Sequence, residues 1–556
     1  MTKKRQIREK GIIILCFAIL FVLILCPLAM IFSKAVIQDG CLDLSNAWNT
    51  VIQSDNLTTI KNSIALGIVV VVFSTMISAP IAFLLSRTEL GRHRFLDIVF
   101  MIPFMTPPYI SSMGWILFMQ KNGLLEQLFP KAAILRDSFF SFWGLAFVMA
   151  LHVFPFMISI LKNAMLNIGS NLEEAGAVFG GGFWYRMRKI MLPLLGGNYA
   201  IGALLVFVKT ISEYGTPATL GQRIGFYVFT TDIHRNCTTA PIDFSKAASL
   251  SMILIGICLF MWYIQNYITT KKSYKIISGK GIKLTKSKLR KSVKISSYAY
   301  LGIVMLLSIG IPYFSVVVSS LIKLRGYGLA KGNFTIQAYI DLFTENSKGL
   351  NAILTSLFLA VAAASVSSIL GTAIATIIRF YKNRWKKSIE AISLLPEMLP
   401  GIVIVIGLML FWNKIYHMIP LYNTLSILVL AYIVLYLPYT VQYVTSSYTQ
   451  MNENLIKAAK TFGGTSWYTF KRVTLPLILK GAITGWIMTF IISFRELVAA
   501  SMMAPPNVLT VSTFIVREFE QGSVSIGMAM AVICMVLTTG ILVVLKAITE
   551  NKEARR

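Results

Sequence analysis

The sequence is poor in charged residues, and acidic residues are the scarcest of them. Only 13% of its 556 residues are charged, with 23 Asp and Glu against 52 Lys and Arg. A soluble domain carries about 25% charged residues. Since 56% of the chain is hydrophobic, a water-soluble fold of this length could not bury its apolar surface. The composition excludes an ordinary soluble protein and indicates a polytopic membrane protein.

The chain also lacks the signatures of common catalytic and metal sites. It has six cysteines but no CxxC pair, so a zinc site is not predicted. No G-x-x-x-x-G-K-S/T phosphate loop occurs, and the four histidines form no Ser/His/Asp constellation. We therefore predict no catalytic residue, no firmly assigned metal ligand and no cofactor bound by this chain. A disulfide between Cys41 and Cys237, both predicted on the outer side, stays an open question.

The net charge of +29 does not indicate a nucleic-acid partner. The basic residues cluster at the ends of apolar runs, as the positive-inside rule expects of a membrane protein. No basic stripe with stacking aromatics lies outside those ends. We therefore predict the lipid bilayer as the partner of this surface, and no nucleic acid.

Apolar runs of roughly 20 residues recur along the chain without period-two alternation, which favours helices over a closed barrel. The first run is longer than the apolar core of a secretory signal, so we interpret it as a retained span. Six runs fall in each half of the sequence, near 11–33, 62–86, 96–119, 141–162, 196–212 and 243–268, then near 298–323, 351–378, 389–412, 424–447, 480–500 and 524–547.

The distribution of basic residues predicts the orientation of these spans. Met1–Lys10 holds five basic residues and one acid, and the segment Arg379–Lys387 holds five basic residues. The segment Lys34–Asn62, by contrast, has three aspartates and two lysines. The positive-inside rule then places both termini in the cytoplasm.

One polar stretch occurs twice. EAGAVFG at 174–180 runs on to IMLP at 190–193, and KAAKTFG at 457–463 runs on to VTLP at 473–476. The two copies are 283 positions apart. Pro155 and Pro438 in the fourth spans keep this offset, as do Glu213 and Glu496 after the fifth spans. Pro103-x3-Pro107, by contrast, matches Pro396-x3-Pro400 at an offset of 293. The repetition predicts an internal duplication.

The predicted fold is an all-α polytopic membrane protein with two tandem six-helix halves. The first half spans 1–268, a basic cytoplasmic linker spans 269–297, and the second half spans 298–556. Because each half has six spans, both copies have the same orientation, and a pseudo-twofold axis along the membrane normal should relate them.

The repeated stretch, Glu-Ala-Ala, three residues, Gly, nine residues, Ile-x-Leu-Pro, resembles the EAA loop of bacterial binding-protein-dependent ABC importer permeases. The resemblance covers nearly the whole chain, with loops at about 170–195 and 453–478. It implies a bacterial cell membrane location, an extracytoplasmic binding protein and two cytoplasmic ATP-binding cassette subunits that use the ATP. The residues implied to couple to those subunits are Glu174, Ala175, Gly180, Ile190, Leu192, Pro193, Ala458, Ala459, Gly463, Val473, Leu475 and Pro476.

The fused two-half arrangement is similar to importers of ferric iron, thiamine and 2-aminoethylphosphonate. The segments 101–109, 211–217, 394–401 and 493–497 look most like ferric iron permeases, so we expect iron to be translocated by alternating access. The other two substrates remain alternatives, and an ion-gradient secondary transporter is a more distant one. The candidate pathway residues are Glu213, Tyr214, Glu397, Arg495 and Glu496.

These pathway residues also admit a structural interpretation. Arg495 and Glu496 would form an ion pair, or Glu496 would stabilise a break in the fifth span. Arg495 would equally suit a phosphonate anion. The sequence leaves these alternatives open.

The two loops depart from the family pattern in different ways. Gly176 replaces the second alanine of the first copy and should loosen that turn, and Lys457 replaces the glutamate of the second. We expect the two docking sites to be unequal, so that Glu174→Ala lowers ATP-dependent uptake more than Lys457→Ala does. Equal losses in the two variants would contradict this expectation.

Overall fold

The computed structural model shows an all-α protein, as predicted. Two two-residue strands, β1 (Ile37–Gln38) and β2 (Cys41–Leu42), form an antiparallel pair. The structure describes residues 3–38, 41–42, 45, 48, 52–271, 286–344, 347–380 and 385–553. The predicted linker at 269–297 therefore lies partly outside the described residues.

Within the described residues, ten helices are long and apolar enough to cross a membrane, and two bent pairs raise the number to as many as twelve. The twelve predicted runs correspond to the larger number. The bent pairs are the third spans of each half, Phe95–Met105 with Pro108–Met119 at 88°, and Trp385–Met398 with Gly401–Lys414 at 111°. Pro107 and Pro400 sit at the two breaks, because proline disfavours helical geometry in the residue before it.

The chain forms two compact units that each draw on both sequence halves. Unit 1 comprises 1–52, 233–255 and 342–517, and unit 2 comprises 53–232, 256–341 and 518–556. The boundaries between units fall inside four helices, α14 (Phe229–Thr238), α15 (Phe244–Lys271), α18 (Gln337–Phe343) and α27 (Val511–Glu520). The predicted boundaries at 268 and 298 therefore describe the sequence repeat, whereas the compact units cross them.

Unit 1 is built mainly from second-half helices and the first span of the chain. Its elements are α1 (Lys3–Leu20), η1 (Phe21–Leu25), α2 (Cys26–Val36), α19 (Lys348–Phe380), α20 (Trp385–Met398), α21 (Gly401–Lys414), α22 (Leu425–Gln450), α23 (Glu453–Thr461), α24 (Ser466–Thr469), η9 (Phe470–Thr474), α25 (Leu475–Phe494) and α26 (Val498–Met503). Helices α19, α22 and α25 pack against one another at its centre.

Unit 2 repeats this arrangement, with α4, α10 and α13 at its centre. Its elements are α4 (Ser54–Arg87), η2 (Glu89–Arg92), α5 (Arg94–Val99), α6 (Ile102–Met105), α7 (Pro108–Met119), α8 (Leu124–Leu128), η3 (Pro130–Ile134), α9 (Leu135–Phe139), α10 (Phe142–Asn167), α11 (Ser170–Val178), α12 (Phe183–Arg186), η4 (Met187–Met191), α13 (Leu192–Ile211), η5 (Pro217–Gly221), η6 (Gln222–Ile224), α16 (Lys291–Met305), η7 (Leu306–Gly310), α17 (Ile311–Leu321), η8 (Arg325–Tyr327) and α28 (Val524–Glu553).

Four prolines of the spans follow directly on a turn of π-helix. Pro27, Pro193, Pro312 and Pro476 each stand two residues beyond η1, η4, η7 and η9, which are all π-helical. A proline ring clashes with the carbonyl four residues before it and donates no hydrogen bond. The extra residue of the π turn accommodates that ring without ending the helix.

The first span of each half packs on the third span of the other half. In unit 1, α2 packs against α21, and in unit 2, α17 packs against α7. Both contacts depend on glycine. A Cβ on Gly407 would lie 2.7 Å from the carbonyl oxygen of Pro27, and a Cβ on Gly114 would lie 2.5 Å from that of Pro312. The two backbones therefore touch at matching points of the duplicated fold.

Gly407→Val should lower the yield of correctly folded protein, because its side chain would meet backbone rather than a movable side chain. Overpacking of this kind costs about 1–3 kcal/mol. The measurement is the monodisperse fraction on size-exclusion chromatography in detergent after heating. Gly302→Val is the matched control, since no atom lies within 4 Å of the site of its Cβ. Equal losses in both variants would contradict the packing argument.

Candidate functional site

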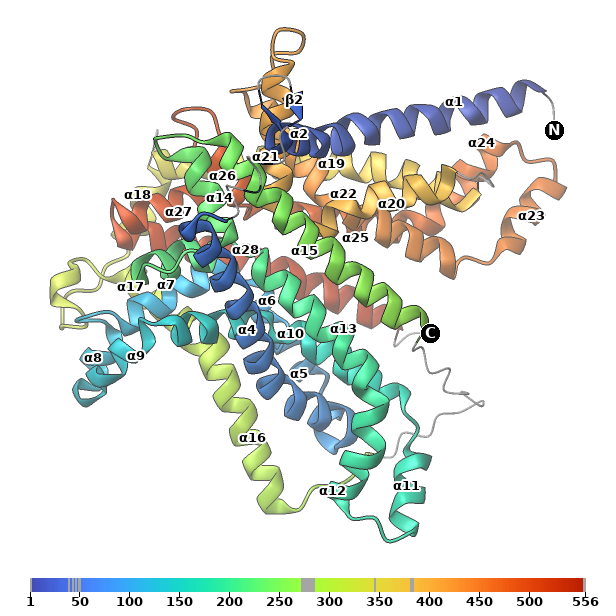
Figure 1. The fold of residues 1–556 in the computed structure, drawn as a ribbon. Coiled ribbons are helices and arrows are strands. Elements are labelled where there is room, and N and C mark those ends of the chain that lie inside the picture. Colours follow the sequence, from blue (N-terminus) through green and yellow to red (C-terminus); the bar gives the residue numbers. More distant parts are fainter. Residues whose placement is uncertain are drawn as a thin grey trace. The chain divides into compact units, whose positions relative to one another are not determined.

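The repeated stretch folds into the same loop twice. Helices α11 and α23 each have nine residues and begin and end 283 positions apart. The short helices α12 and α24 follow, and both lead into α13 and α25 through a π turn. Figure 1 shows α11 and α12 at the end of unit 2 where α16 begins, and α23 with α24 at the end of unit 1 where α1 begins. Each loop thus consists of two short helices that precede the fifth span.

A glycine in the left-handed region ends the first helix of each loop. Gly180 and Gly463 both have φ of +80°. Around Gly180, the N–H of Gly181 donates to the carbonyl of Gly176 at 2.8 Å and the N–H of Gly180 to that of Ala177 at 3.0 Å. This is the Schellman pattern, which leaves the last carbonyls of the helix paired and turns the chain sharply. The second loop repeats both bonds.

Each loop presents three exposed aromatic side chains at matching positions. Phe179 and Phe462 are both 90% exposed, and the other pairs are also exposed, Trp184 with Trp467 and Tyr185 with Tyr468. Large aromatics gathered on a projecting loop are typical of contact with a partner protein. The coupling residues around them are solvent-accessible as well, with Ala175, Leu192 and Pro193 exposed in the first loop and Ala458 and Pro476 in the second.

The side chain of Ile190 fills the space beside Gly176, so the turn is closely packed. A Cβ at Gly176 would lie 2.7 Å from Cδ1 of Ile190. At the corresponding positions the second loop has Ala459 and Val473. The first loop therefore combines glycine with the longer isoleucine, and the second combines alanine with the shorter valine, so the two pairs fill a similar volume. The expectation that Gly176 loosens the turn does not account for this packing.

An ion pair that sequence reasoning missed holds the first loop to the bundle of unit 2. Arg87, only 5% exposed, lies 2.9 Å from Glu173 and donates to the carbonyl of Ile168 at 2.9 Å. It thereby joins the end of α4 to the end of α10 and the start of α11. The signal in the sequence was an arginine at the inner end of a span. The corresponding positions of the second half are Phe380 and Ile456, which cannot form such a pair.

The described end of the linker lies along the segment that follows Arg87. The N–H of Ser287 donates to the carbonyl of Arg87 at 3.0 Å, and the N–H of Glu89 donates to that of Ser287 at 3.2 Å. Lys294 and Glu89 form an ion pair of 3.0 Å. The hydrogen bond from Lys294 lowers the pKa of the Glu89 carboxyl below its usual value.

The two glutamates after the fifth spans pair with backbone N–H groups. The N–H of Thr216 donates to both carboxylate oxygens of Glu213, at 3.0 and 3.1 Å. The N–H groups of Ala499 and Ala500 donate to Glu496 at 3.0 and 3.1 Å. Each carboxylate satisfies the start of the next helical segment. This geometry favours the interpretation that Glu496 stabilises a break in the fifth span.

Hydroxyl groups complete the same break in both units. Thr230 donates to the carbonyl of Glu213 at 2.7 Å, and Ser512 donates to that of Glu496. Ser63 of α4 accepts from the N–H of Phe229 at 2.8 Å, and Ser356 of α19 accepts from that of Val511 at 2.8 Å. The duplication thus extends to individual hydrogen bonds.

Of the remaining candidate pathway residues, Tyr214 lies in unit 2, and Glu397 and Arg495 lie in unit 1. Tyr214 is buried in unit 2, and its carbonyl accepts from the N–H of Ala218. Glu397, at the end of α20, is exposed and accepts a hydrogen bond from Gln442 of α22. Arg495 is half-buried beside Glu496. Cys237 is a buried free thiol.

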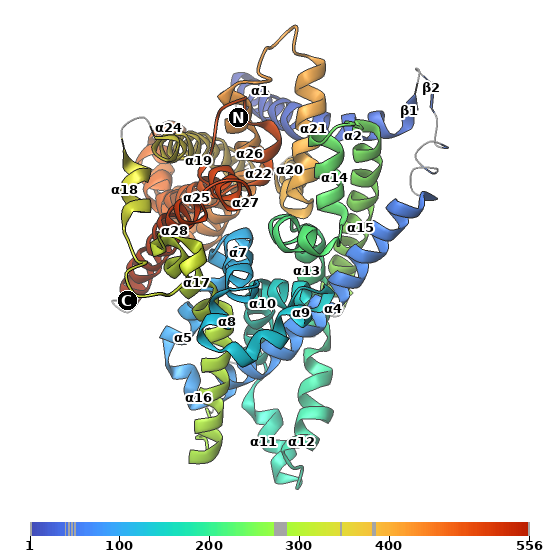
Figure 2. The same cartoon turned by 90° about the vertical axis from the view of Figure 1, so that its left-hand side faces the viewer.

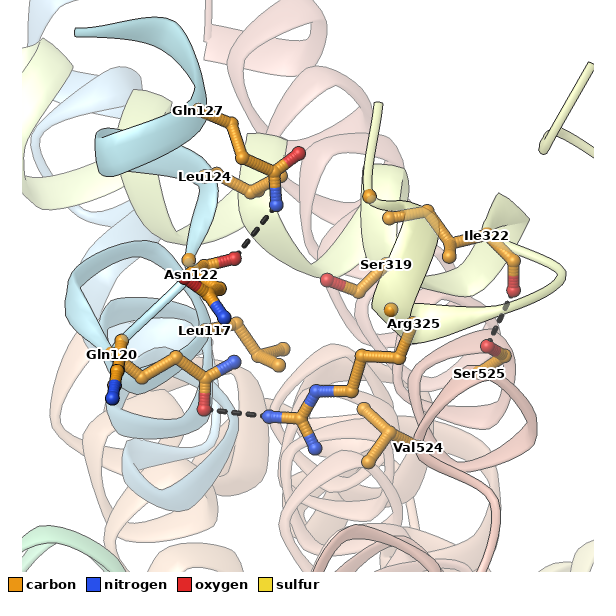
Figure 3. Close-up of a pocket in the computed structure, with 14 residues that line it drawn as sticks. Leu117, Gln120, Asn122, Leu124, Gln127, Ser319, Ile322, Arg325, Val524 and Ser525 are labelled. Carbon is orange, nitrogen blue, oxygen red and sulfur yellow. Dashed lines mark hydrogen bonds between the residues drawn. The ribbon is translucent and has the colours of Figure 1, made fainter. Parts of the chain in front are cut away.

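A cavity of about 330 Å³ opens in unit 2 between α7, α17 and α28 (Figure 3). The Arg325 guanidinium donates to Gln120 at 2.6 Å, and Gln127 donates to the carbonyl of Asn122 at 2.7 Å. Its described lining has two cationic side chains and no carboxylate, and consists of Leu117, Gln120, Lys121, Asn122, Gly123, Leu124, Gln127, Ser319, Ile322, Arg325, Gly326, Gly328, Val524 and Ser525.

Two segments of the chain, 92–274 and 367–553, match the profile of one protein family. Its description is "Binding-protein-dependent transport system inner membrane component", and the matches cover more than half of the chain. The chain belongs to this family. It is thus a multi-pass inner-membrane permease, and the family works with a binding protein and an ATPase. The two matches also agree with a fused permease made of two repeats.

Similar curated proteins include named ferric permeases. The Fe(3+)-transport system permease protein FbpB 2 of Haemophilus influenzae is 24% identical over 89% of this chain and 90% of its own length. The ferric transport system permease protein FbpB of Actinobacillus pleuropneumoniae is 23% identical over 87% and 70%. A putative 2-aminoethylphosphonate transport system permease protein PhnV of Salmonella typhi is 22% identical over 43% and 89%.

Gly176→Ala should weaken transport mildly, because the added methyl group would lie 2.7 Å from Cδ1 of Ile190, the movable end of that side chain, which would have to shift. The double variant Gly176→Ala with Ile190→Val should recover most of the loss, since it reproduces the pairing of the second loop. The measurement is ATP-dependent uptake by the assembled transporter. Ile190→Val alone serves as the control. A double variant as impaired as Gly176→Ala would contradict the size match.

Proposed function

We propose that this chain is the membrane-spanning permease of an ATP-driven importer that carries ferric iron into the cytoplasm. The pair of matching loops supports the coupling part of the proposal most directly. Both loops offer Phe, Trp and Tyr side chains to a partner at a fixed offset of 283 positions. Two equivalent loops suit two ATP-binding cassette subunits, one for each loop. This chain then binds no ATP and no other cofactor itself.

The coupling residues act through these loops. Glu174, Ala175 and Gly180 shape the exposed face of the first loop, and Ile190 fills its inner side. Leu192 and Pro193 open the fifth span. The second loop uses the corresponding set, Ala458, Ala459, Gly463, Val473, Leu475 and Pro476. Closure of the ATPase subunits would push on α11 and α23, and Arg87 would pass that push to α4 and α10.

Both termini lie in the cytoplasm in this proposal. Figure 1 shows the start of α1 at the same end of unit 1 as α24, so the N-terminus and the second loop share a side. The basic N-terminal segment favours the cytoplasmic side for both. In unit 2, the start of α16 and the first loop also share an end (Figure 2), which places the linker on that side too.

The outer face receives the substrate-loaded binding protein. The cavity of unit 2 lies where α7 and α17 end and α28 begins, at span ends that the orientation places outside. Arg325 and Lys121 give it a positive character that suits an acidic side chain of a partner. After docking, the two halves would rock between outward-facing and inward-facing states as ATP binds and is hydrolysed.

Ferric iron is the substrate that the relatives favour, since three relatives that match most of the chain are named for it. A 2-aminoethylphosphonate substrate is the second candidate. A relative of that name matches part of the chain, and the half-buried Arg495 is a suitable partner for a phosphonate.

The proposal predicts ATP-dependent iron uptake by the reconstituted complex. Proteoliposomes would hold the permease, its ATPase and internal ATP, and the iron-loaded binding protein would be added outside. Radioactive iron should accumulate inside. An ATPase variant that lacks its catalytic glutamate should abolish the uptake, whereas ionophores that collapse ion gradients should leave it unchanged. Uptake of the phosphonate instead of iron would overturn the substrate, and uptake without ATP hydrolysis would overturn the mechanism.

A further inference from the structure

Four tyrosines of α22 follow one face of the helix. Tyr432, Tyr436, Tyr439 and Tyr443 are spaced by four, three and four residues, which places their side chains in a single row. The ring centroids of Tyr432 and Tyr436 are 6.3 Å apart, as are those of Tyr436 and Tyr439. The row runs from a fully buried ring at Tyr432 to half-buried rings at the other three positions. We call Tyr436, Tyr439 and Tyr443 the tyrosine row.

Charged groups from two other elements of unit 1 meet the tyrosine row. Glu397, at the end of α20, accepts a hydrogen bond from Gln442, the neighbour of Tyr443. Helices α20 and α25 both pack against α22, which brings Glu397 near Tyr439 and Tyr443, and Arg495 near Tyr439. Glu397 stands three residues before Pro400, at the bend of the third span. A helix break, a carboxylate and several phenols therefore converge in one place.

The first half has nothing of this kind at the corresponding positions. The counterparts of Glu397, Tyr436, Tyr439, Tyr443 and Arg495 are Phe104, Val153, Phe156, Ile160 and Ser212. In unit 2 the rings of Phe104 and Phe156 pack edge to face with centroids 4.5 Å apart. A carboxylate and a phenol thus occupy the positions where the other half has two phenylalanines. Since two phenylalanines pack well at these positions in the first half, packing alone does not explain the carboxylate and the phenol in the second.

An ionisable side chain within a membrane span is costly, and one without a structural role is a candidate pathway residue. The carboxylates of Glu213 and Glu496 already accept from backbone N–H groups, whereas Glu397 is exposed and its bonded partner is a side-chain amide. Hard cations prefer ligands with oxygen donors, such as carboxylates and phenols. The corresponding positions of the first half offer no such oxygen donors.

We propose that Glu397 and the tyrosine row form a transient coordination site for the ferric ion on its way through the permease. This inference rests on the proposed function and adds the chemistry of the substrate contact. Each phenol that coordinates the ion releases its proton to water and takes a proton back from water when the ion leaves, while Glu397 coordinates as the carboxylate throughout. The positive charge of Arg495 weakens the site, which suits a pathway because a transported ion must also leave.

A tyrosine of the same helix provides the matched control. Tyr448 is fully buried, its hydroxyl lies 2.8 Å from that of Thr376, and its ring packs against Phe380. Its hydroxyl therefore serves the internal structure of unit 1 and not the row. Tyr448→Phe and Tyr439→Phe remove the same atom from the same helix, so a difference between them reports the site and not the loss of a phenol as such.

The test measures iron uptake and ATP hydrolysis together in the reconstituted complex with its binding protein. Glu397→Gln should lower the number of iron atoms imported per ATP hydrolysed by about tenfold or more, the order found when metal-site groups are removed. Tyr439→Phe should lower it in the same direction, and ATP hydrolysis stimulated by the loaded binding protein should persist. Tyr448→Phe should keep the wild-type ratio.

The outcomes separate this inference from the proposed function. An unchanged ratio in Glu397→Gln and Tyr439→Phe, with intact uptake by the wild type, would overturn the coordination site alone. An equal loss in Tyr448→Phe would assign the row to structure and overturn it as well. If the wild type imports no iron in the presence of ATP, both the function and the site fail. Should Glu397→Gln not assemble, Tyr439→Phe decides, since it deletes a single half-buried hydroxyl.

Discussion

A helix that breaks within a membrane span leaves carbonyl groups at its end, and N–H groups at the start of the next helical segment, without water to pair with. The fifth spans of this permease stop in that way, after Ile211 and after Phe494. In both cases a glutamate two residues further on turns back and accepts the N–H groups of the next helical segment. Helices α14 and α27 are joined to these two breaks by Thr230 and Ser512, which donate to the carbonyls of Glu213 and Glu496. Because these two carboxylates are occupied by backbone hydrogen bonds, other polar side chains have to contact the transported substrate.

The sequence revealed the fold through features that repeat along it. Twelve apolar runs and the Gly180/Gly463 and Pro193/Pro476 pairs were sufficient to predict two tandem helical halves with a repeated loop in each. Pro107 and Pro400 mark the bends of the third spans. The apolar runs around them nevertheless look continuous, because hydropathy does not report the direction of the helix axis. The exchange of first spans had no sequence signal, since a glycine that permits close approach looks the same whichever partner approaches it.

The candidate site was predicted less completely, for a physical reason. Glu213 and Glu496 were the obvious charged residues near the spans, but only the backbone geometry shows that they act as caps. Arg87 and Glu173 are 86 positions apart, and their ion pair depends on how α4 meets α11. The tyrosine row was visible as a spacing of four and three, and its contrast with the phenylalanines of the first half becomes meaningful only when Glu397 is seen beside it. The two halves therefore share the structure of their loops but differ in the side chains of corresponding helices.

The close contact of Gly407 with Pro27 joins residues 380 positions apart. A ribosome adds about 5–20 residues per second, so the first span emerges roughly 20 to 80 s before the helix it will pack against. During that interval its apolar surface faces lipid, and unit 1 cannot close. Neither unit is therefore complete before the second half of the chain is made, and a ribosome that stalls in the linker would leave behind a membrane-inserted chain with both units unfinished.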